Sequence, residues 1–262
     1  MENPSRKKLI QRYYSFRAKD YDRQKSRTWK SDKGFGNEVH SEMLSALEGF
    51  GNKNVLEVGV GTGRNAVPLL ERIGPYLVGL DLSKEMLEAA RKKMVHFRKN
   101  CDFVLGDAEH LPFQTRPFDA IVCMSTMHYF ESQEKMLKIF KDVLRERGIL
   151  VYGDLTIHES DRQGFFETLE RILSKAHKRY CKPSEIEKMM KIHGFRVCRA
   201  KTIPYRKSYR ALIEDKGEYF DVAPEILEKR IKEATMDAKK QYGLTDTKLT
   251  LFYTVIKALK EN

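Results

Sequence analysis

Five short apolar runs alternate with longer amphipathic stretches between residues 54 and 151. The runs are Val55–Val58, Tyr76–Leu80, Cys101–Leu105, Ala120–Met124 and Ile149–Tyr152. Between the second and third runs, residues 84–99 place apolar side chains at three- and four-residue steps, as a helix with one buried face does. Strands and helices that alternate in this way form a parallel sheet with helices on both faces. We therefore predict an α/β, Rossmann-like fold.

Two more strands are expected further along the chain. Residues 195–203 follow a helix predicted over Pro183–Ile192, and residues 248–258 alternate apolar and polar side chains as a half-exposed strand does. These two strands would close the sheet as an edge pair, which brings the expected sheet to seven strands. Helices are also predicted over residues 134–147, ending before Gly148, and from Pro224 to about Gln241.

The segments outside this core are predicted to form a cap. We place a helical cap segment at residues 1–50, the core at 51–204, a cap insertion at 205–247 and the final core strand at 248–262. The insertion is too long for a simple turn and too apolar to remain in water. We expect it to enclose the site and select the substrate, although a dimer contact is the alternative. The sequence does not indicate the oligomeric state.

The first predicted strand carries Glu57 near its end and continues into a turn that contains Gly59, Gly61 and Gly63. Glycines let the backbone turn tightly and approach a ligand closely, and open sheets bind ligands at the carboxyl ends of their strands. The carboxylate of Glu57 would repel a dinucleotide pyrophosphate. It would attract the amino group of S-adenosylmethionine, directly or through water. The alternative is a tight strand–helix turn that binds nothing.

Two further acids stand at the ends of the next predicted strands. Asp81 follows the second strand about 20 residues after the glycines, where an acid can accept hydrogen bonds from both ribose hydroxyls. Asp107 follows the third strand and could accept from an adenine amino group. Leu82 and Met86 could contact the adenine through their apolar side chains. Three acids at successive strand ends strengthen the case for a nucleoside cofactor.

These residues resemble the class I S-adenosylmethionine-dependent methyltransferases, and within them the ubiquinone/menaquinone C-methyltransferase-like group. The resemblance covers about residues 54–155. Its matching segments are Val55–Gly63, Gly79–Ser83, Gly106–Phe113, Phe118–Val122, Met127–Phe130 and Leu144–Gly148. It is specific for the fold and for the cofactor S-adenosyl-L-methionine, and much less so for the acceptor of the methyl group.

The resemblance also implies cofactor-binding residues. They are Gly59, Gly61, Thr62, Asp81, Asp107, Ala108 and Met124. Upstream, Ala18–Asp22 is similar to the Tyr-Asp element that folds over the cofactor in this group, which adds Tyr21 to the expected site.

Catalytic residues are poorly marked, because the cofactor already carries an activated methyl group. The protein must mainly align the acceptor and exclude water. His128, in the loop after the fourth strand, is the best candidate for a general base, since an imidazole titrates near neutral pH. The alternative is that His128 only stabilises this loop. Asp154 and His158, after the fifth strand, are weaker candidates. The four cysteines are scattered, so no metal site is expected.

We expect transfer to a small-molecule acceptor, which could be lipophilic or quinone-like. The net charge of +12 keeps a tRNA, rRNA or protein acceptor as the alternative, because Arg6, Lys7, Lys8 and Arg12 are interleaved with Tyr13, Tyr14 and Phe16. A third hypothesis is a non-catalytic subunit that binds S-adenosylmethionine. The N-terminus lacks an apolar signal core and no stretch is long enough to span a membrane, so we expect a cytoplasmic protein.

The cofactor assignment predicts a ligand profile that calorimetry can measure. The chain should bind S-adenosylmethionine and S-adenosylhomocysteine, and it should bind neither NAD nor FAD. The reason is the acid that precedes the glycine turn, which repels a pyrophosphate. Saturable binding of NAD without any response to S-adenosylhomocysteine would refute the assignment.

Overall fold

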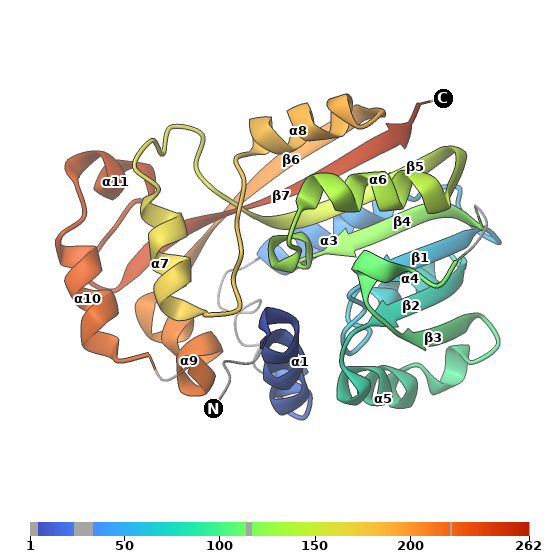
Figure 1. Ribbon diagram of the computed structural model, residues 1–262, viewed down its shortest axis with the longest axis horizontal. Coiled ribbons are helices and arrows are strands. Elements are labelled where there is room, and N and C mark those ends of the chain that lie inside the picture. Colours follow the sequence, from blue (N-terminus) through green and yellow to red (C-terminus); the bar gives the residue numbers. More distant parts are fainter. Residues whose placement is uncertain (1–4, 24–33, 114–116, 221, 262) are drawn as a thin grey trace.

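A single mixed sheet organises the molecule (Figure 1). The computed structural model describes residues 5–23, 34–113, 117–220 and 222–261, and seven strands within these ranges form one sheet in the order β3-β2-β1-β4-β5-β7-β6. The strands are β1 (Asn54–Val58), β2 (Tyr76–Asp81), β3 (Cys101–Leu105), β4 (Phe118–Met124), β5 (Leu144–Thr156), β6 (Phe195–Ser208) and β7 (Lys248–Lys260). Strand β7 runs antiparallel to β5 and β6, while the pairs from β3 to β5 are parallel. The predicted α/β fold with its closing edge pair is confirmed.

Helices cover both faces of this sheet. The helices of the described residues are α1 (Arg6–Arg17), α3 (Phe35–Ala46), α4 (Ala66–Arg72), α5 (Lys84–Lys93), α6 (Gln133–Val143), α7 (Phe165–Leu173), α8 (Pro183–Ile192), α9 (Tyr209–Phe220), α10 (Pro224–Lys232) and α11 (Met236–Gln241). Short 3-10 helices are η1 (Val95–Phe97), η2 (Ala108–His110) and η3 (Met127–Tyr129). No described helix is both long and apolar enough to cross a membrane.

Alternate residues of the central strands enter two separate apolar cores. Val55 of β1 and Val122 of β4 pack with α3 and α4, whereas Leu56 and Ile121 pack with α6 and α8. Successive side chains of a strand point to opposite faces, so a strand that is apolar at every position must be covered on both sides. This explains why the central runs of the sequence lack polar alternation.

Helix α3 belongs to this covered sheet, although the sequence placed residues 1–50 in a cap. Val39 and Met43 are buried in the core against the sheet, and Glu42 pairs with Arg199 and Lys201 of β6. The helix has an apolar face that only a sheet of this width can bury. Residues 1–4 and 24–33 of the predicted cap lie outside the described residues.

The helix predicted over residues 134–147 ends early. Helix α6 stops at Val143, and Leu144 already pairs with Phe118 as the first residue of β5. The Lys260 ammonium donates to the carbonyls of Lys141 and Leu144, which satisfies the end of the helix. Gly148 therefore does not terminate a helix. A Cβ there would lie 2.8 Å from the Arg145 carbonyl oxygen, within the irregular start of β5.

The insertion after β6 is shorter than predicted. Strand β6 continues past Ile203 to Ser208 and pairs with β7 along its whole length. Pro204 is tolerated because β6 is the edge strand, where one missing N–H need not cost a pair. The helix predicted from Pro224 to Gln241 is two helices, since Thr235 caps a new start at α11.

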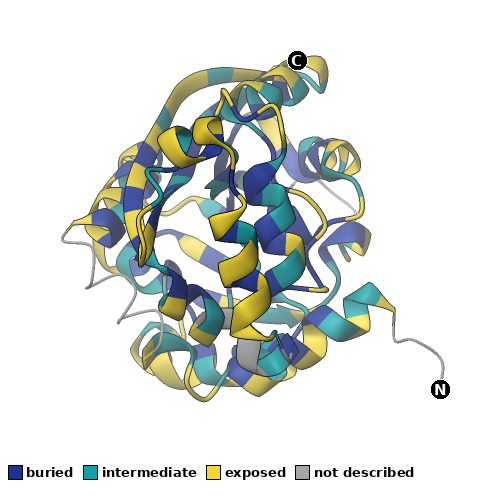
Figure 2. Ribbon diagram, turned by 90° about the vertical axis from the view of Figure 1, so that its left-hand side faces the viewer, coloured by how far each residue is buried: buried dark blue, intermediate teal, exposed yellow. Residues whose placement is uncertain are grey.

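The cap packs through only part of its apolar face. Leu227 and Ile231 of α10 are buried as expected, whereas Ile226 is 54% exposed. Figure 2 looks onto the cap and shows the exposed residues on its outer side.

The buried carboxylate of Asp161 joins the cap to the core. It accepts hydrogen bonds from the backbone N–H groups of Gln163, Gly164, Phe165 and Phe166 at the start of α7. The hydroxyl of Tyr242, just after α11, donates to the same group at 2.8 Å. Removing this acceptor would leave several buried donors without a partner.

Replacing Asp161 with Ala should therefore lower the free energy of unfolding by about 2–4 kcal/mol. Urea denaturation followed by circular dichroism measures the loss. Asp237→Ala, which removes an exposed acid from α11, is the matched control and should leave stability nearly unchanged. Equal stability of both variants would show that the Asp161 network contributes little.

Candidate active site

The glycine turn after β1 brings backbone close to two other segments. Gly59 has φ +72° and a Cβ there would lie 2.3 Å from Thr126 Oγ1. Gly63 has φ +78° and a Cβ would lie 2.6 Å from Met94 Sδ. Both the dihedral angle and the close contact exclude a side chain at these positions. The backbone itself therefore forms this wall of the site.

Asp81, at the end of β2, connects this turn to the next loop. One carboxylate oxygen accepts from the Gly61 N–H at 2.8 Å and the other from the Ser83 N–H at 2.9 Å. Burial raises the pKa of Asp81, while these backbone N–H groups act in the opposite direction. A carboxylate has about four lone-pair sites, so Asp81 retains capacity to accept from ribose hydroxyls.

Asp107, after β3, has cationic neighbours. It accepts from the Glu109 N–H at 2.9 Å, and its other oxygen lies 2.5 Å from Lys7 Nζ and 3.1 Å from His110 Nδ1. Burial would raise the pKa of Asp107, but the hydrogen bonds from Lys7, Glu109 and His110 hold it below its ordinary value. Asp107 is therefore an ionised acceptor at neutral pH.

Glu57 lies behind the turn. Its side chain is buried, and the Asn65 amide donates to it at 3.4 Å. Burial raises its pKa to about 8. Among the described residues, Glu57 Oε2 has no hydrogen-bond partner. A buried oxygen of this kind fits a cationic amino group, reached through Asn65 or a water molecule.

A cavity at the carboxyl ends of β1, β2, β3 and β4 brings most of the predicted cofactor residues together. The space between its walls is about 960 Å³, which includes open solvent. Its walls include Tyr21, Gly59, Gly61, Thr62, Asp81, Leu82, Met86, Asp107, Ala108 and Met124. Glu57 and Gly63 stand behind these walls. The loop around Tyr21 is held by Asp22, which accepts from the Thr62 hydroxyl at 2.6 Å.

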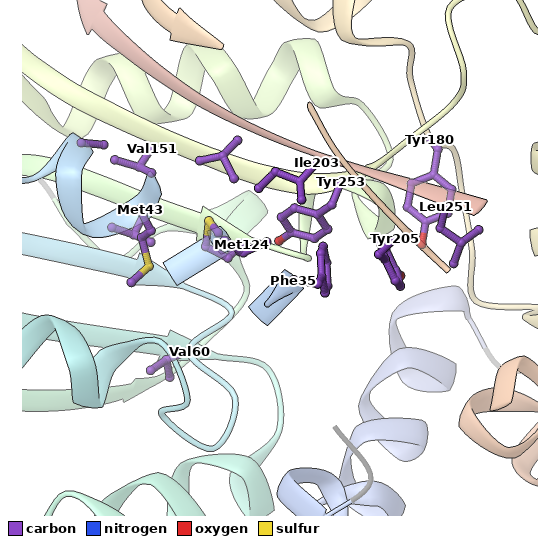
Figure 3. Close-up of a cluster of buried hydrophobic side chains, with 14 of the residues drawn as sticks. Phe35, Met43, Val60, Met124, Val151, Tyr180, Ile203, Tyr205, Leu251 and Tyr253 are labelled. Carbon is purple, nitrogen blue, oxygen red and sulfur yellow. The ribbon is translucent and has the colours of Figure 1, made fainter. Parts of the chain in front are cut away.

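A second cavity adjoins the first one and is rich in aromatic side chains. Its aromatic walls are Tyr13, Tyr14, Tyr21, Phe35, Tyr129, Tyr180, Tyr205 and Tyr253. Figure 3 shows Phe35, Tyr205 and Tyr253 close together, and the Phe35 and Tyr205 rings stack with centroids 3.9 Å apart. The two cavities share five wall residues, namely Tyr14, Tyr21, Arg64, Ser125 and Tyr129. A ligand in one cavity would therefore face a ligand in the other.

His128 lies in the wall of this second cavity. Its Nδ1 is 2.9 Å from both carboxylate oxygens of Asp154, and Asp154 also accepts from the His128 backbone N–H. Both side chains are buried. A carboxylate at Nδ1 places the ring proton on that nitrogen, so Nε2 is the nitrogen that can accept a proton. His158, in contrast, lines neither cavity.

The second cavity is polar as well as aromatic. Glu170 and Lys207 are both buried in its walls, and Arg64 contributes a further cation. Burial raises the pKa of Tyr14, Tyr129 and Tyr180, so these hydroxyls are neutral donors at physiological pH. The cavity can therefore hold a flat or apolar molecule that also carries hydrogen-bonding groups.

Several wall residues were not predicted from the sequence. Lys7 and Tyr14 of α1, Asn65, Ser125 and Tyr129 line the cofactor cavity. Most of the second cavity was also missed, because its residues come from α1, α3, α7, β6 and β7. The aromatic side chains interleaved with cations at residues 6–16 were the one signal in the sequence.

Comparison with known proteins identifies the family. Residues 55–148 match a family model described as a methyltransferase domain. The chain is 32% identical over 168 residues to the demethylmenaquinone methyltransferase of Thermotoga maritima, across 55% of this chain and 71% of that protein. The chain belongs to the class I S-adenosylmethionine-dependent methyltransferases. The predicted enzyme class and cofactor are thereby confirmed.

Solved structures share the fold of this methyltransferase. The YcgJ protein of Bacillus subtilis superposes with a TM-score of 0.75 at 22% identity, over 86% of this chain and 99% of that one. Phosphoethanolamine N-methyltransferase 2 of Haemonchus contortus, solved with S-adenosylhomocysteine, has a TM-score of 0.56 at 18% identity. The superposition covers 85% of this chain and 53% of the Haemonchus contortus enzyme.

The role expected for Asp81 can be measured directly. Asp81→Ala should weaken binding of S-adenosylhomocysteine by about 2–4 kcal/mol, because two charge-assisted hydrogen bonds are lost. Calorimetry gives the affinity, and thermal unfolding shows whether the variant is folded. Asp102→Ala, which removes an acid from the exposed side of β3, should bind normally. Unchanged affinity in folded Asp81→Ala protein would exclude a ribose contact.

Proposed function

We propose that this methyltransferase transfers the methyl group of S-adenosylmethionine to a small-molecule acceptor held in the second, aromatic cavity. The observation that carries the proposal is the set of five residues shared by the two cavities. A methyl donor in the first cavity and an acceptor in the second would meet across Tyr14, Ser125 and Tyr129. Transfer requires such an approach, with the reacting atoms aligned.

The lining of the second cavity supports a planar or lipophilic acceptor. Aromatic walls bind flat and apolar molecules, whereas buried hydroxyls and charges fix their orientation. The relative from Thermotoga maritima is named for a quinone acceptor, demethylmenaquinone. A quinone-like acceptor for this chain is consistent with both observations.

The proposed chemistry needs few protein groups. When bound, S-adenosylmethionine supplies a methyl group activated on a sulfonium. Glu57, through Asn65, and Asp81 and Asp107 would hold the cofactor by its amino group, ribose and adenine. The aromatic walls would keep water away from the junction of the cavities. An acceptor with a hydroxyl or amino group must lose a proton.

We assign proton removal to His128 Nε2, with Asp154 as the positioning residue. Asp154 holds the ring through Nδ1 and would stabilise the imidazolium formed when Nε2 takes the proton. The protein does not then need to ionise a tyrosine, whose pKa values are raised by burial.

A tRNA, rRNA or protein acceptor is the alternative, and the position of α1 weighs against it. Tyr13 and Tyr14, which could stack on bases, line the second cavity, and only Phe16 of this set is largely exposed, at 57%. An RNA held only by surface charge should dissociate at moderate salt. Tight, sequence-selective RNA binding at about 0.2 M salt would favour the alternative.

Mass spectrometry can identify the acceptor. Cell extract incubated with the enzyme and isotopically labelled S-adenosylmethionine should yield a labelled small molecule. Boiled enzyme and folded Asp81→Ala protein are the controls. Label confined to RNA or protein would overturn the proposal.

The pairing of His128 with Asp154 leads to a specific prediction, which can be tested once the acceptor is identified. His128→Gln should lower kcat by about 10²–10⁴-fold, as removal of a general base does, while S-adenosylhomocysteine binding stays unchanged. Asp154→Asn should lower kcat less and shift the pH profile of kcat, because the ring remains but its orientation and tautomer are disturbed. Full activity of folded His128→Gln protein would show that His128 only stabilises the loop.

A further inference from the structure

Helix α1 forms part of the wall of both cavities. Lys7, Ile10 and Gln11 face the cofactor cavity, Tyr13 faces the acceptor cavity, and Tyr14 faces both. The helix precedes the methyltransferase domain matched at residues 55–148, so its attachment to the core must come from side-chain contacts. Where these contacts lie determines where Tyr14 stands.

Lys7 ties α1 to the wall of the cofactor cavity through two ion pairs. Its Nζ lies 2.5 Å from Asp107 Oδ2 and 2.6 Å from Glu109 Oε2. The Glu109 side chain is only 5% exposed, so this pair is partly shielded from solvent. Burial alone would lower the pKa of Lys7, but the hydrogen bonds to both acids raise it above the ordinary value. The ammonium is therefore charged at physiological pH.

Other contacts of α1 reach the same side of the cofactor cavity. The Gln11 amide donates to the Leu82 carbonyl at 3.2 Å, and Ser15 Oγ lies 3.2 Å from Ser83 Oγ. Two helical turns after Lys7 and on the same face of the helix, the Tyr14 and Tyr129 hydroxyls lie 3.0 Å apart at the junction of the cavities. These contacts are neutral, but α1 makes further charged contacts: Arg6 pairs with Glu131, and Ser15 donates to the Glu85 carboxylate. Glu131 and Glu85 are exposed, whereas Glu109 is buried, so the Lys7–Glu109 pair has the acid best shielded from solvent.

We propose that Lys7 is a positioning residue whose ion pairs to Asp107 and Glu109 hold α1 closed, so that Tyr14 is fixed between cofactor and acceptor. Asp107 then serves two partners, the adenine of the cofactor and the lysine of the lid. Binding of the cofactor at Asp107 is thereby linked to the position of Tyr14, which completes the wall of the acceptor cavity. The holding of α1 by Lys7 can be tested with the cofactor alone. Its consequence for the acceptor rests on the proposed function.

The test measures how fast the full chain releases S-adenosylhomocysteine, using surface plasmon resonance. Lys7→Met should release it at least about tenfold faster than the wild-type chain, because a charge-assisted contact of the lid is lost. Lys8→Met, which removes the exposed lysine next to it on α1, is the matched control and should release it at the wild-type rate. Lys7→Arg keeps the charge and should retain slow release.

Hydrogen exchange provides a readout that does not depend on turnover. S-adenosylhomocysteine should protect the backbone amides of α1 in the wild-type chain and in Lys8→Met, and protect them much less in Lys7→Met. Thermal unfolding checks that all three variants are folded. Because no acceptor is used, failure of the proposed acceptor would leave these results intact.

Three outcomes would overturn the inference. Wild-type release and α1 protection in folded Lys7→Met would show that the pairs do not hold the helix. Equal acceleration in Lys8→Met would indicate a general charge effect. Release from Lys7→Arg as fast as from Lys7→Met would show that the charge of residue 7 is not what holds α1.

Discussion

The half-buried carboxylate of Asp81 holds together the two loops on which the cofactor cavity depends. It joins the Gly61 N–H of the first loop to the Ser83 N–H of the second. Both loops follow adjacent parallel strands, β1 and β2, whose ends meet at one edge of the sheet. A carboxylate between two backbone donors is costly to bury and is retained only with such partners. The walls that would face a ribose are positioned by the residue expected to bind it.

The second, aromatic cavity has a different origin. No single segment carries it, since Phe35 comes from α3, Glu170 from α7, and Tyr205 and Lys207 from β6. The long pairing of β6 with β7 brings Tyr205 opposite Leu251 and thereby extends the sheet beyond the core. Helix α7, which Asp161 ties to Tyr242 of the cap, closes the same region. The lining of this cavity therefore depends on packing between the edge strands, the cap and the N-terminal helices.

Much of the positive charge of the chain is matched locally by acids. Arg199 and Lys201 of β6 pair with Glu42, and Lys201 also with Glu38. These pairs tie α3 to the edge strand, and the hydrogen bond from Arg199 holds the pKa of Glu42 below its ordinary value. Exposed pairs of this kind contribute little to stability.

The sequence alone determined the sheet and the cofactor side of the site, because both are local. Gly59, Gly61, Asp81 and Asp107 each follow a short apolar strand, and parallel strands bring such residues to one edge. The tertiary structure alone decided the rest. The boundary between α6 and β5 is stabilised by Lys260, which lies more than a hundred residues further along the chain. The pairing of Asp154 with His128, the place of Lys7 beside Asp107 and the aromatic cavity likewise arise between distant segments. The periodicity of apolar residues in the sequence does not predict such contacts, because they depend on how complete helices and strands pack together.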